Sequence, residues 1–459
     1  MKKLSSLIII LALSFKLTMF AQGTWSAAGS LNFPVKSLCT DVEHGVLYAG
    51  GAFTATGAYS TGIAKWNGST WTNIAGGMLT GTAISTMIID NNGNLVVGGT
   101  FTSIGGVLSK NVARWNGTVW SALGDGLEYT GATTVSTLLM FDGELYAAGT
   151  FTLSGATSVN YIAKWNGSSW QPLGTGTNGK VLALCEFNGE LYAGGTFTNA
   201  GGVSVNNIAK WNGSSWSDVD GGVEYTGATT VSTLKSTNSL LYVGGTFTTA
   251  GGNSVKNIAT WDGTEWSDVG GGVEYTGATT VSTLLIVDGD IWTGGTFTEA
   301  GGGTANYVAK WNGSSWTSVG TGMNYTVNSL EKLGNAVFAG GPFQYAGGTA
   351  APYIAKWAEE VEIRSVAAEE EPSSTDTRES FDVFPNPVKT ELNVRINNDD
   401  PTALYNIVLY DATGRIVLEL KNIQHEVHIE RANMAGGLYF YQITDHDGMM
   451  KQEGKISVE

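Results

Sequence analysis

The chain of 459 residues contains 64 Gly but only 8 Pro, and charged residues make up 14% of it. Its 15 Trp, 17 Tyr and 16 Phe exclude a disordered chain, and the scarcity of Pro excludes a collagen-like one. The net charge of −16, from 24 basic and 40 acidic side chains, argues against nucleic acid as a partner.

The first 21 residues have the pattern of a signal peptide. Lys2 and Lys3 give a positive start, residues 7–13 are wholly apolar, and the small Ala21 precedes the expected cleavage point. We therefore predict a signal peptide at 1–21. An uncleaved membrane anchor is the alternative, but the apolar run is shorter than the ~20 residues of a spanning helix, and we expect no transmembrane segment in the mature chain.

Two phrases recur throughout the region 23–358, with copies 46 to 50 residues apart. The first, Ile-Ala-Lys-Trp or a close variant, ends at Trp66, Trp115, Trp165, Trp211, Trp261, Trp311 and Trp357. The second, Gly-Gly-Thr-Phe or a variant, ends at Phe53, Phe101, Phe151, Phe197, Phe247, Phe297 and Phe343. Seven copies of two independent phrases indicate a repeat architecture.

A second Trp follows the first six lysine-Trp phrases by five residues, and it is missing after Trp357. These residues are Trp71, Trp120, Trp170, Trp216, Trp266 and Trp316. Trp25, just after the predicted signal peptide, has the sequence context of the missing partner. A closed ring explains this split, because an N-terminal strand then completes the blade that the C-terminal strands begin.

Each repeat contains four strand-like segments separated by Gly, Asn, Asp or Ser. In the fifth copy they are 231–234, 240–247, 257–261 and 266–269. Four short strands in a repeat of this length are typical of a propeller blade. The phrase Trp-Asn-Gly-Ser-Ser-Trp predicts a cross-strand Trp pair in the blade core, and the paired Gly predict close backbone approach.

We therefore predict an all-β fold in which residues 23–358 form a seven-bladed β-propeller closed by an N-terminal strand. The phrases resemble kelch and galactose-oxidase-like propeller repeats in the Gly-Gly followed by an aromatic residue and in the paired Trp. This resemblance implies the fold and no particular activity.

The two cysteines occupy equivalent places in this scheme. Cys39 follows Val-Lys-Ser-Leu and Cys185 follows Val-Leu-Ala-Leu, so each lies in the first strand of its blade. Blades so far apart in a ring cannot bring two Cα atoms within the ~7 Å that a disulfide needs. We therefore predict two free, buried thiols.

Three of the predicted blade-to-blade connections carry the same string, Glu-Tyr-Thr-Gly-Ala-Thr-Thr, at 128–134, 224–230 and 274–280. Because strands alternate in direction, these connections share one rim with the longer loops. Carboxylates and aromatic rings there suit a glycan or a protein ligand. The candidate binding residues are Glu128, Tyr129, Glu224, Tyr225, Glu274 and Tyr275. Recent copying of blades is the competing explanation, since it produces identical loops without selection for binding.

Residues 23–358 carry no catalytic motif. Their one histidine, His44, offers no Ser-His-Asp arrangement, and Asp288-Gly-Asp290 is too short for a calcium loop. We expect no catalytic residue, no metal and no cofactor. A hydrolase or lyase acting on carbohydrate, with its site on the long-loop rim or in the central channel, is the alternative, because residues of different blades can form a site without a motif.

The composition changes after Trp357. Residues 359–380 are rich in acidic side chains and predict an extended linker. Residues 381–459 contain short strand candidates separated by Asn, Asp and Gly turns, which predict a small Ig-like β-sandwich. The candidates are 392–396, 405–410, 416–420, 426–429, 438–443 and 455–458.

Four motifs in residues 381–459 resemble, in order, those of the type A C-terminal sorting domain of the type IX secretion system. They are Phe384-Pro385-Asn386-Pro387, Leu409-Tyr410-Asp411-Ala412-Thr413-Gly414-Arg415, Ala435-Gly436-Gly437-Leu438-Tyr439-Phe440 and Lys455-Ile456-Ser457-Val458. The resemblance makes Pro385, Asn386, Pro387, Gly414, Arg415, Gly437, Tyr439 and Lys455 the expected sorting-motif residues. It implies export by a Bacteroidetes-type bacterium through the outer-membrane secretion machinery, followed by release or attachment at the cell surface.

Together these patterns predict a secreted or outer-membrane surface-attached protein. Its propeller is expected to bind a glycan or a surface protein without catalysis. The carbohydrate-active enzyme is the second reading, and a structural spacer in a surface layer is the third.

Overall fold

The computed structural model describes residues 23–53, 62–74, 83–131, 133–275, 277, 279–359, 380–389, 391–397, 403–412, 416–424, 426–430, 436–446 and 449–458. The predicted signal peptide, most of the predicted linker, and the motif residues Gly414 and Arg415 lie outside them. The chain divides into two compact units, Met1–Glu362 and Ile363–Glu459.

Seven four-stranded antiparallel sheets make up the first unit's framework, and we number them as blades 1 to 7. Their innermost strands are β2 (Val35–Asp41), β6 (Ala83–Ile89), β12 (Val135–Phe141), β18 (Val181–Phe187), β25 (Thr230–Ser236), β32 (Val281–Val287) and β38 (Ser329–Leu333). The second strands are β3 (Val46–Gly51), β7 (Leu95–Thr100), β13 (Glu144–Gly149), β19 (Glu190–Gly195), β26 (Leu241–Thr246), β33 (Asp290–Gly295) and β39 (Ala336–Gly340). The third strands are β4 (Ile63–Trp66), β10 (Val112–Trp115), β16 (Ile162–Trp165), β22 (Ile208–Trp211), β29 (Ile258–Trp261), β36 (Val308–Trp311) and β42 (Ile354–Glu359). The outermost strands are β5 (Trp71–Asn73), β11 (Trp120–Ala122), β17 (Trp170–Pro172), β23 (Trp216–Asp218), β30 (Trp266–Asp268), β37 (Trp316–Ser318) and β1 (Gly23–Ala27).

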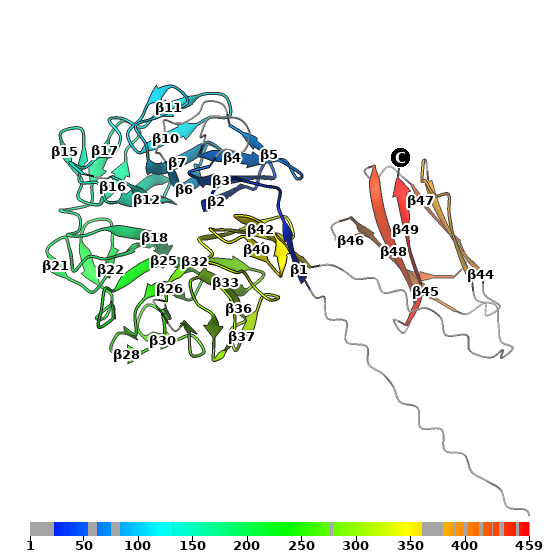
Figure 1. Ribbon diagram of the computed structural model, residues 1–459. Coiled ribbons are helices and arrows are strands. Elements are labelled where there is room, and N and C mark those ends of the chain that lie inside the picture. The colour runs from blue at the N-terminus through cyan, green and yellow to red at the C-terminus, as the bar shows by residue number, and fades with distance from the viewer. Residues whose placement is uncertain are drawn as a thin grey trace, which may run out of the picture. The chain divides into compact units, whose positions relative to one another are not determined.

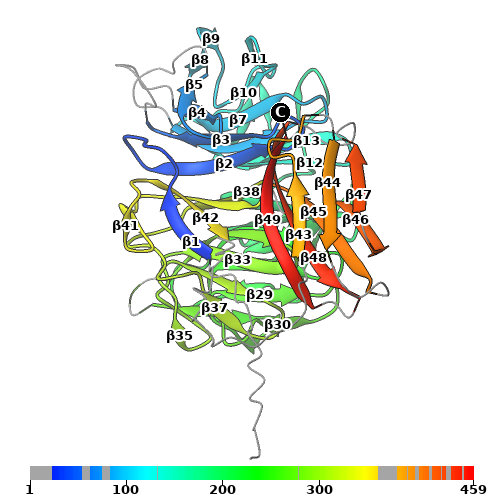
Figure 2. The same ribbon diagram turned by 90° about the vertical axis from the view of Figure 1, so that its right-hand side faces the viewer.

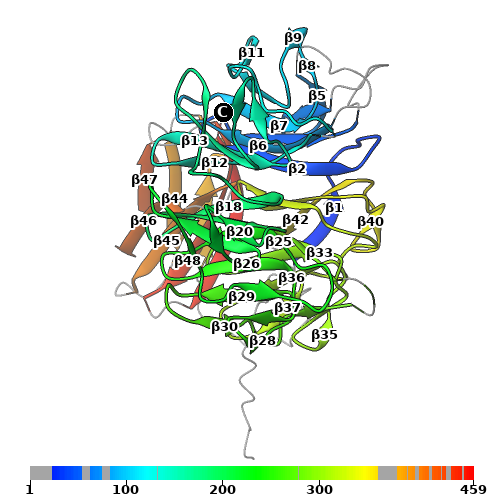
Figure 3. The ribbon, with the colours of Figure 1, turned by 90° about the vertical axis from the view of Figure 1, so that its left-hand side faces the viewer.

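The blades form a closed ring (Figure 1). Each innermost strand contacts that of the next blade, and β38 contacts β2 to complete the circle. The N-terminal strand β1 lies beside β42 as the outermost strand of blade 7, with Trp25 opposite Trp357 (Figure 2). From the opposite side, β6, β12, β18 and β25 follow one another along the ring (Figure 3). The prediction of an all-β propeller closed by its N-terminal strand is confirmed.

The Trp pairs join the third and outermost strands of each blade, as predicted. Trp211 lies directly opposite Trp216 in the β22–β23 ladder, and their ring centroids are 5.3 Å apart. The turn between them is stabilised by the side-chain oxygen of Asn212, which accepts hydrogen bonds from the N–H groups of Ser214 and Ser215. Such a buried aromatic pair stabilises the outer edge of a sheet that has no further strand to cover it.

The outermost Trp of a blade also connects it to the preceding blade. Its indole N–H donates a hydrogen bond to the carbonyl of the residue that follows the preceding blade's outermost strand. The donor and acceptor pairs are Trp71 with Ala28, Trp170 with Leu123, Trp216 with Leu173, Trp266 with Val219, Trp316 with Val269 and Trp25 with Val319. These bonds give each carbonyl a partner from the next blade, in most cases beside a turn hydrogen bond such as that from the Gly176 N–H to the Leu173 carbonyl.

The two glycines of the repeated Gly-Gly phrase have different roles, which blade 4 illustrates. A Cβ on Gly194 would lie 2.2 Å from Cγ1 of Val231 in blade 5, so this glycine lets two blades approach closely. A Cβ on Gly195 would lie 1.9 Å from the carbonyl oxygen of Lys180, beside an irregularity in the β18–β19 register. The second glycine therefore accommodates a bulge within its own blade.

Small hairpins between the second and third strands add structure where the sequence predicted loops. They are β8 (Ser103–Ile104) with β9 (Val107–Leu108), β14 (Leu153–Ser154) with β15 (Thr157–Ser158), β20 (Asn199–Ala200) with β21 (Val203–Ser204), β27 (Thr249–Ala250) with β28 (Asn253–Ser254), β34 (Glu299–Ala300) with β35 (Gly303–Thr304), and β40 (Tyr345–Ala346) with β41 (Thr349–Ala350). Two connections contribute a further strand each, β24 (Val223–Glu224) and β31 (Val273–Glu274). The sequence missed these hairpins because each strand has only two residues.

The second unit consists of two antiparallel sheets around an apolar core. One sheet contains β43 (Ser380–Phe384), β44 (Glu391–Asn397) and β47 (Glu426–Glu430), and the other contains β46 (Ile416–Ile423), β45 (Tyr405–Asp411), β48 (Gly437–Asp445) and β49 (Met450–Val458). Strands occur at all six predicted positions, and β43 is additional. Its Phe381 packs edge-on against Tyr405 of the other sheet, with ring centroids 5.1 Å apart.

The indole hydrogen bond predicts a measurable difference between the two Trp of one pair. We expect Trp216→Phe to lower the free energy of unfolding by about 1 kcal/mol more than Trp211→Phe, because only the first removes the indole hydrogen bond to the Leu173 carbonyl, which then keeps only its bond from the Gly176 N–H. Urea titrations followed by circular dichroism give both values. Equal losses would show that the pair stabilises through its ring contact alone.

The bulge glycine predicts a second effect on stability. We expect Gly195→Ala to destabilise the propeller by about 2 kcal/mol or more, since a backbone oxygen rather than a mobile side chain must move. Gly303→Ala is the matched control, because the nearest atom to its Cβ would be 3.6 Å away. Thermal unfolding of both variants makes the comparison, and similar midpoints would contradict the assignment.

Candidate functional site

Because successive strands of a blade are antiparallel, the described small hairpins and connections between blades lie on one face of the ring, which we call the wide rim. There, β24 pairs with β27 and β31 pairs with β34, so a connection joins the hairpin of the blade that follows it. Glu128 forms the equivalent bridge with Leu153. The six predicted binding residues lie on these three connections, which are three separate blade junctions and not one cluster.

The three predicted glutamates are held by side chains of the preceding blade. Both carboxylate oxygens of Glu128 lie 2.9 Å from Nζ of Lys110. Glu224 accepts a hydrogen bond of 2.8 Å from the amide of Asn206, and Glu274 forms an ion pair with Lys256. These interactions fix the path of the connections, so the structure gives the glutamates an intramolecular role.

The three predicted tyrosines are the exposed part of the same connections. Tyr129, Tyr225 and Tyr275 have 46%, 45% and 45% of their surface exposed. Each ring lies over the glycine two residues further on, and at Gly227 a Cβ would be 2.7 Å from the ring of Tyr225. The small residue therefore supports an aromatic ring that would otherwise project from the loop.

Sequence reasoning missed a tyrosine cluster at blade 6. Tyr307, immediately before β36, stacks on Tyr325 with ring centroids 6.3 Å apart and planes inclined by 20°. Burial raises the pKa of Tyr307, and nearby Tyr275 and Tyr325 raise it further. The sequence does contain one sign of this cluster. Tyr stands at position 307, whereas the corresponding position holds Asn in blades 2, 4 and 5.

The innermost strands place one acid and one base toward the middle of the ring. Burial raises the pKa of Glu331 on β38, and the positive charge of Lys235 on β25 opposes that rise. Because blade 6 separates these strands, both side chains face the ring's centre. A raised pKa suits a general acid, but carbohydrate hydrolysis ordinarily requires a second carboxyl group.

The cysteines occupy the predicted equivalent positions. Cys39 lies opposite Tyr48 and Cys185 lies opposite Tyr192, and both are buried and free. Burial raises the pKa of both thiols, in Cys39 together with the charges of Glu331 and Asp41. Each therefore remains a protonated thiol, which is a poor nucleophile.

Within the part of the chain that the structure describes, no three His, Cys, Asp or Glu side chains gather as a metal site requires. No helix of sufficient length and apolar character to cross a membrane is found among those residues either.

The sorting-motif residues of the second unit meet at its terminal strand. The side-chain oxygen of Asn386 accepts a hydrogen bond of 2.9 Å from the N–H of Ser457, and its amide donates to the Lys455 carbonyl. Pro385 and Pro387 flank Asn386 on this segment, and Val388 bridges to Val458. On the other side of β49, Gly437 lies opposite Val458 and Tyr439 opposite Ile456.

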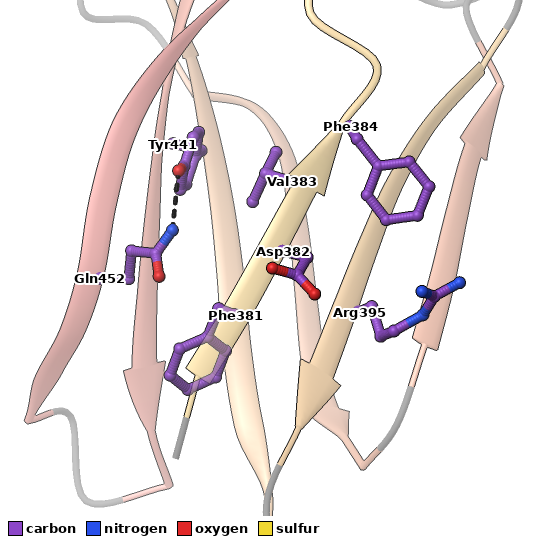
Figure 4. Close-up of a pocket in the computed structure, with 7 residues that line it drawn as sticks. All are labelled: Phe381, Asp382, Val383, Phe384, Arg395, Tyr441 and Gln452. Carbon is purple, nitrogen blue, oxygen red and sulfur yellow. Dashed lines mark hydrogen bonds between the residues drawn. The ribbon is translucent and has the colours of Figure 1, made fainter. Parts of the chain in front are cut away.

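An open hollow of about 520 Å³ lies on the second unit (Figure 4). It is lined by Phe381, Asp382, Val383, Phe384, Arg395, Tyr441 and Gln452. The guanidinium of Arg395 lies 5.1 Å from the ring centre of Phe384, and Gln452 donates a 2.9 Å hydrogen bond to the Tyr441 hydroxyl. The polar groups of the hollow are thus already paired with their neighbours.

Comparison of the chain with protein families identifies its C-terminal part. Residues 382–459 match the family described as a secretion system C-terminal sorting domain, which confirms the type IX resemblance. Residues 91–117 match a β-propeller family described as a domain of unknown function. No curated protein sequence matches the chain.

Solved structures show distant likenesses. The extracellular domain of a two-component system protein from B. thetaiotaomicron has a TM-score of 0.44 at 14% identity, covering 93% of this chain. PorZ, a surface component of the type IX secretion system of Porphyromonas gingivalis, has a TM-score of 0.33 at 13% identity, covering 93% of this chain and 66% of its own. YCF48 bound to D1 peptide has a TM-score of 0.44 at 12% identity, and the match covers 75% of this chain and all of the YCF48 chain. This chain spans 56% of the first of these structures.

The sorting domain determines where the protein is found. A chain that carries it engages the type IX secretion machinery and is secreted or attached to the cell surface. The predicted localisation is therefore confirmed.

The Asn386 contacts predict an effect on export. We expect Asn386→Ala to reduce the secreted fraction severalfold, because the Ser457 N–H and the Lys455 carbonyl lose exposed hydrogen bonds that contribute about 0.5–1.5 kcal/mol each. Immunoblots of medium, cell surface and periplasm measure that fraction. A variant that lacks residues 381–459 should stay in the periplasm and serves as the reference for lost export.

The matched control for this prediction is Asn397→Ala. Asn397, at the end of β44, is also an exposed residue of the second unit, but among the described residues its amide bonds the side chains of Ser380 and Asp382. Equal export of both variants would mean that the Asn386 bonds are dispensable for sorting.

Proposed function

We propose that the propeller is a non-catalytic binding module that holds a glycan or a surface protein at its wide rim. The observation that carries this proposal is the set of half-exposed tyrosines Tyr129, Tyr225 and Tyr275, each supported by a glycine in an ordered connection. Tyrosine provides a large contact area at a small cost in conformational entropy, which suits a recognition surface. Export to the cell exterior gives such a surface access to extracellular ligands.

A signal peptide at 1–21, a linker at 359–380 and an origin in the Bacteroidetes complete the proposal. The two ends have complementary tasks in it. The N-terminal segment directs the chain across the inner membrane, and residues 381–459 direct it across the outer membrane. The linker separates the sorting domain from the propeller, so that one can be recognised while the other binds.

A carbohydrate-active enzyme is the second candidate. The half-buried Glu331 at the ring's centre favours it, because a carboxyl group with a raised pKa can act as a general acid near neutral pH. The binding module is preferred because the ionisable side chains shown to interact with Glu331 among the described residues are Lys235 and Cys39, and neither is the second carboxyl group that carbohydrate hydrolysis ordinarily requires.

The rim tyrosines predict a loss of binding. On glycan and surface-protein arrays, we expect a variant with Tyr129, Tyr225 and Tyr275 all changed to Ala to bind its ligand at least tenfold more weakly than wild type, since about 1.4 kcal/mol of stacking is enough for that factor. Surface plasmon resonance with the array ligand gives the two Kd values.

The control changes two exposed apolar residues in the short turns on the opposite rim, Val42→Ser and Val119→Ser, with 85% and 59% of their surface exposed. Binding that survives the triple Tyr variant would move the site away from these connections. Release of reducing sugar from a bound glycan by wild type, abolished in Glu331→Gln, would favour the enzyme instead.

A further inference from the structure

Three tyrosines of the propeller occupy a backbone conformation that favours glycine and asparagine. Tyr161, Tyr307 and Tyr353 have φ angles of 70°, 65° and 68°. The corresponding positions of the other blades hold Gly62, Asn111, Asn207 and Asn257, also with positive φ. A bulky side chain in the left-handed region costs free energy, and such residues are often kept where they serve a function.

Asparagine at this position also makes a hydrogen bond that tyrosine gives up. The amide groups of Asn111, Asn207 and Asn257 donate to the carbonyls of Leu127, Val223 and Val273 in the following connection. At Tyr307 the side chain instead extends toward aromatic neighbours. Its ring stacks on Tyr325 of the next connection, and Tyr275 of the preceding connection is close enough to influence its ionisation.

These contacts gather three phenol rings on the wide rim around blade 6. Tyr307 is half-buried at the centre, while Tyr275 and Tyr325 flank it with 45% and 56% of their surface exposed. Since burial raises the pKa of Tyr307, its phenol remains neutral at physiological pH and is able to donate a hydrogen bond. We call Tyr275, Tyr307 and Tyr325 the blade 6 platform.

The charges beside the platform limit the ligands that it can hold. Glu274 and Glu299 lie directly opposite each other in the β31–β34 ladder, and Asp268 is also near. One base, Lys256, faces these three carboxylates, so the surroundings are negative. A polyanion would be repelled there, whereas the exposed carboxylate of Glu299 is able to accept hydrogen bonds from hydroxyl groups.

We propose that the blade 6 platform binds a neutral polysaccharide by stacking its phenol rings on the C–H faces of hexopyranose units. The negative face of an aromatic ring attracts these weakly positive C–H groups, and the phenol and carboxylate groups at the edge bind the sugar hydroxyls. A protein ligand would instead require a closely packed, fully desolvated pocket around its anchor residues. This inference rests on the proposed binding function and assigns it a ligand class and a site.

Affinity electrophoresis of the full exported protein tests the proposal. The gels contain either neutral polysaccharides (β-1,3-glucan, xyloglucan, galactomannan, α-mannan or starch) or acidic ones (polygalacturonate or alginate). We expect at least one neutral polymer to retard the protein, with an affinity that falls at least tenfold in Tyr307→Asn. This variant introduces the residue of blades 2, 4 and 5, so its melting temperature should equal or exceed that of wild type and separate lost binding from lost folding.

Tyr161→Asn is the matched control, because it makes the same exchange at the same backbone position of blade 3. We expect it to leave the affinity unchanged. Tyr325→Ala, which removes the stacked partner, should reproduce the loss seen in Tyr307→Asn.

The remaining outcomes distinguish this inference from the proposed function. If a neutral polymer retards wild type and Tyr307→Asn equally, the platform is wrong while the binding module stands. Retardation by acidic polymers alone, or capture only of a basic protein on a surface-protein array, overturns the neutral-glycan assignment and again leaves the binding module. A wild-type protein that binds none of these ligands overturns both.

Discussion

The hydrogen bond from an outer-strand indole to the preceding blade is the interaction on which the rest of the propeller depends. One carbonyl lies just beyond the outermost strand of a blade, and the Trp side chain of the next blade donates a hydrogen bond to it. The same side chain packs against its cross-strand partner. One residue thus joins the strands within a blade and the blades to each other, which explains its presence in every repeat.

The glycine pairs let neighbouring blades approach closely enough for this contact to form. The Trp residues and the glycine pairs thus hold the blades together, and neither belongs to the exposed part of the wide rim. The blades are fixed at their outer edges by Trp and near the centre by Gly, whereas side chains of the wide-rim connections such as Tyr129 and Tyr225 are exposed. In blade 6, the stack of Tyr307 on Tyr325 replaces the asparagine hydrogen bond that blades 2, 4 and 5 make at the same position.

The sequence predicted most of the framework because its signals are periodic and local. The paired Trp, the Gly-Gly phrases and the unmatched Trp25 specify strands, pairing and closure without reference to distant parts of the chain. The candidate site was less predictable. Glu128 and Lys110 are brought together by the return of the chain, and the Tyr307 stack depends on a connection that carries only part of the repeated string. The identical strings showed which segments form the connections of the wide rim. They did not show that the glutamates of these connections are paired with neighbouring side chains while the tyrosines are exposed.

The pairing of β1 with β42 gives the ring an order of assembly. Trp25 and Trp357 lie opposite each other although almost the whole propeller separates them in sequence. Closing a loop of that length costs about 5 kcal/mol of chain entropy, which only the complete set of blades can offset. β1 therefore finds its partner strand only once β42 has been synthesised, and since the sorting domain follows β42, a chain truncated before β42 also lacks the signal for crossing the outer membrane.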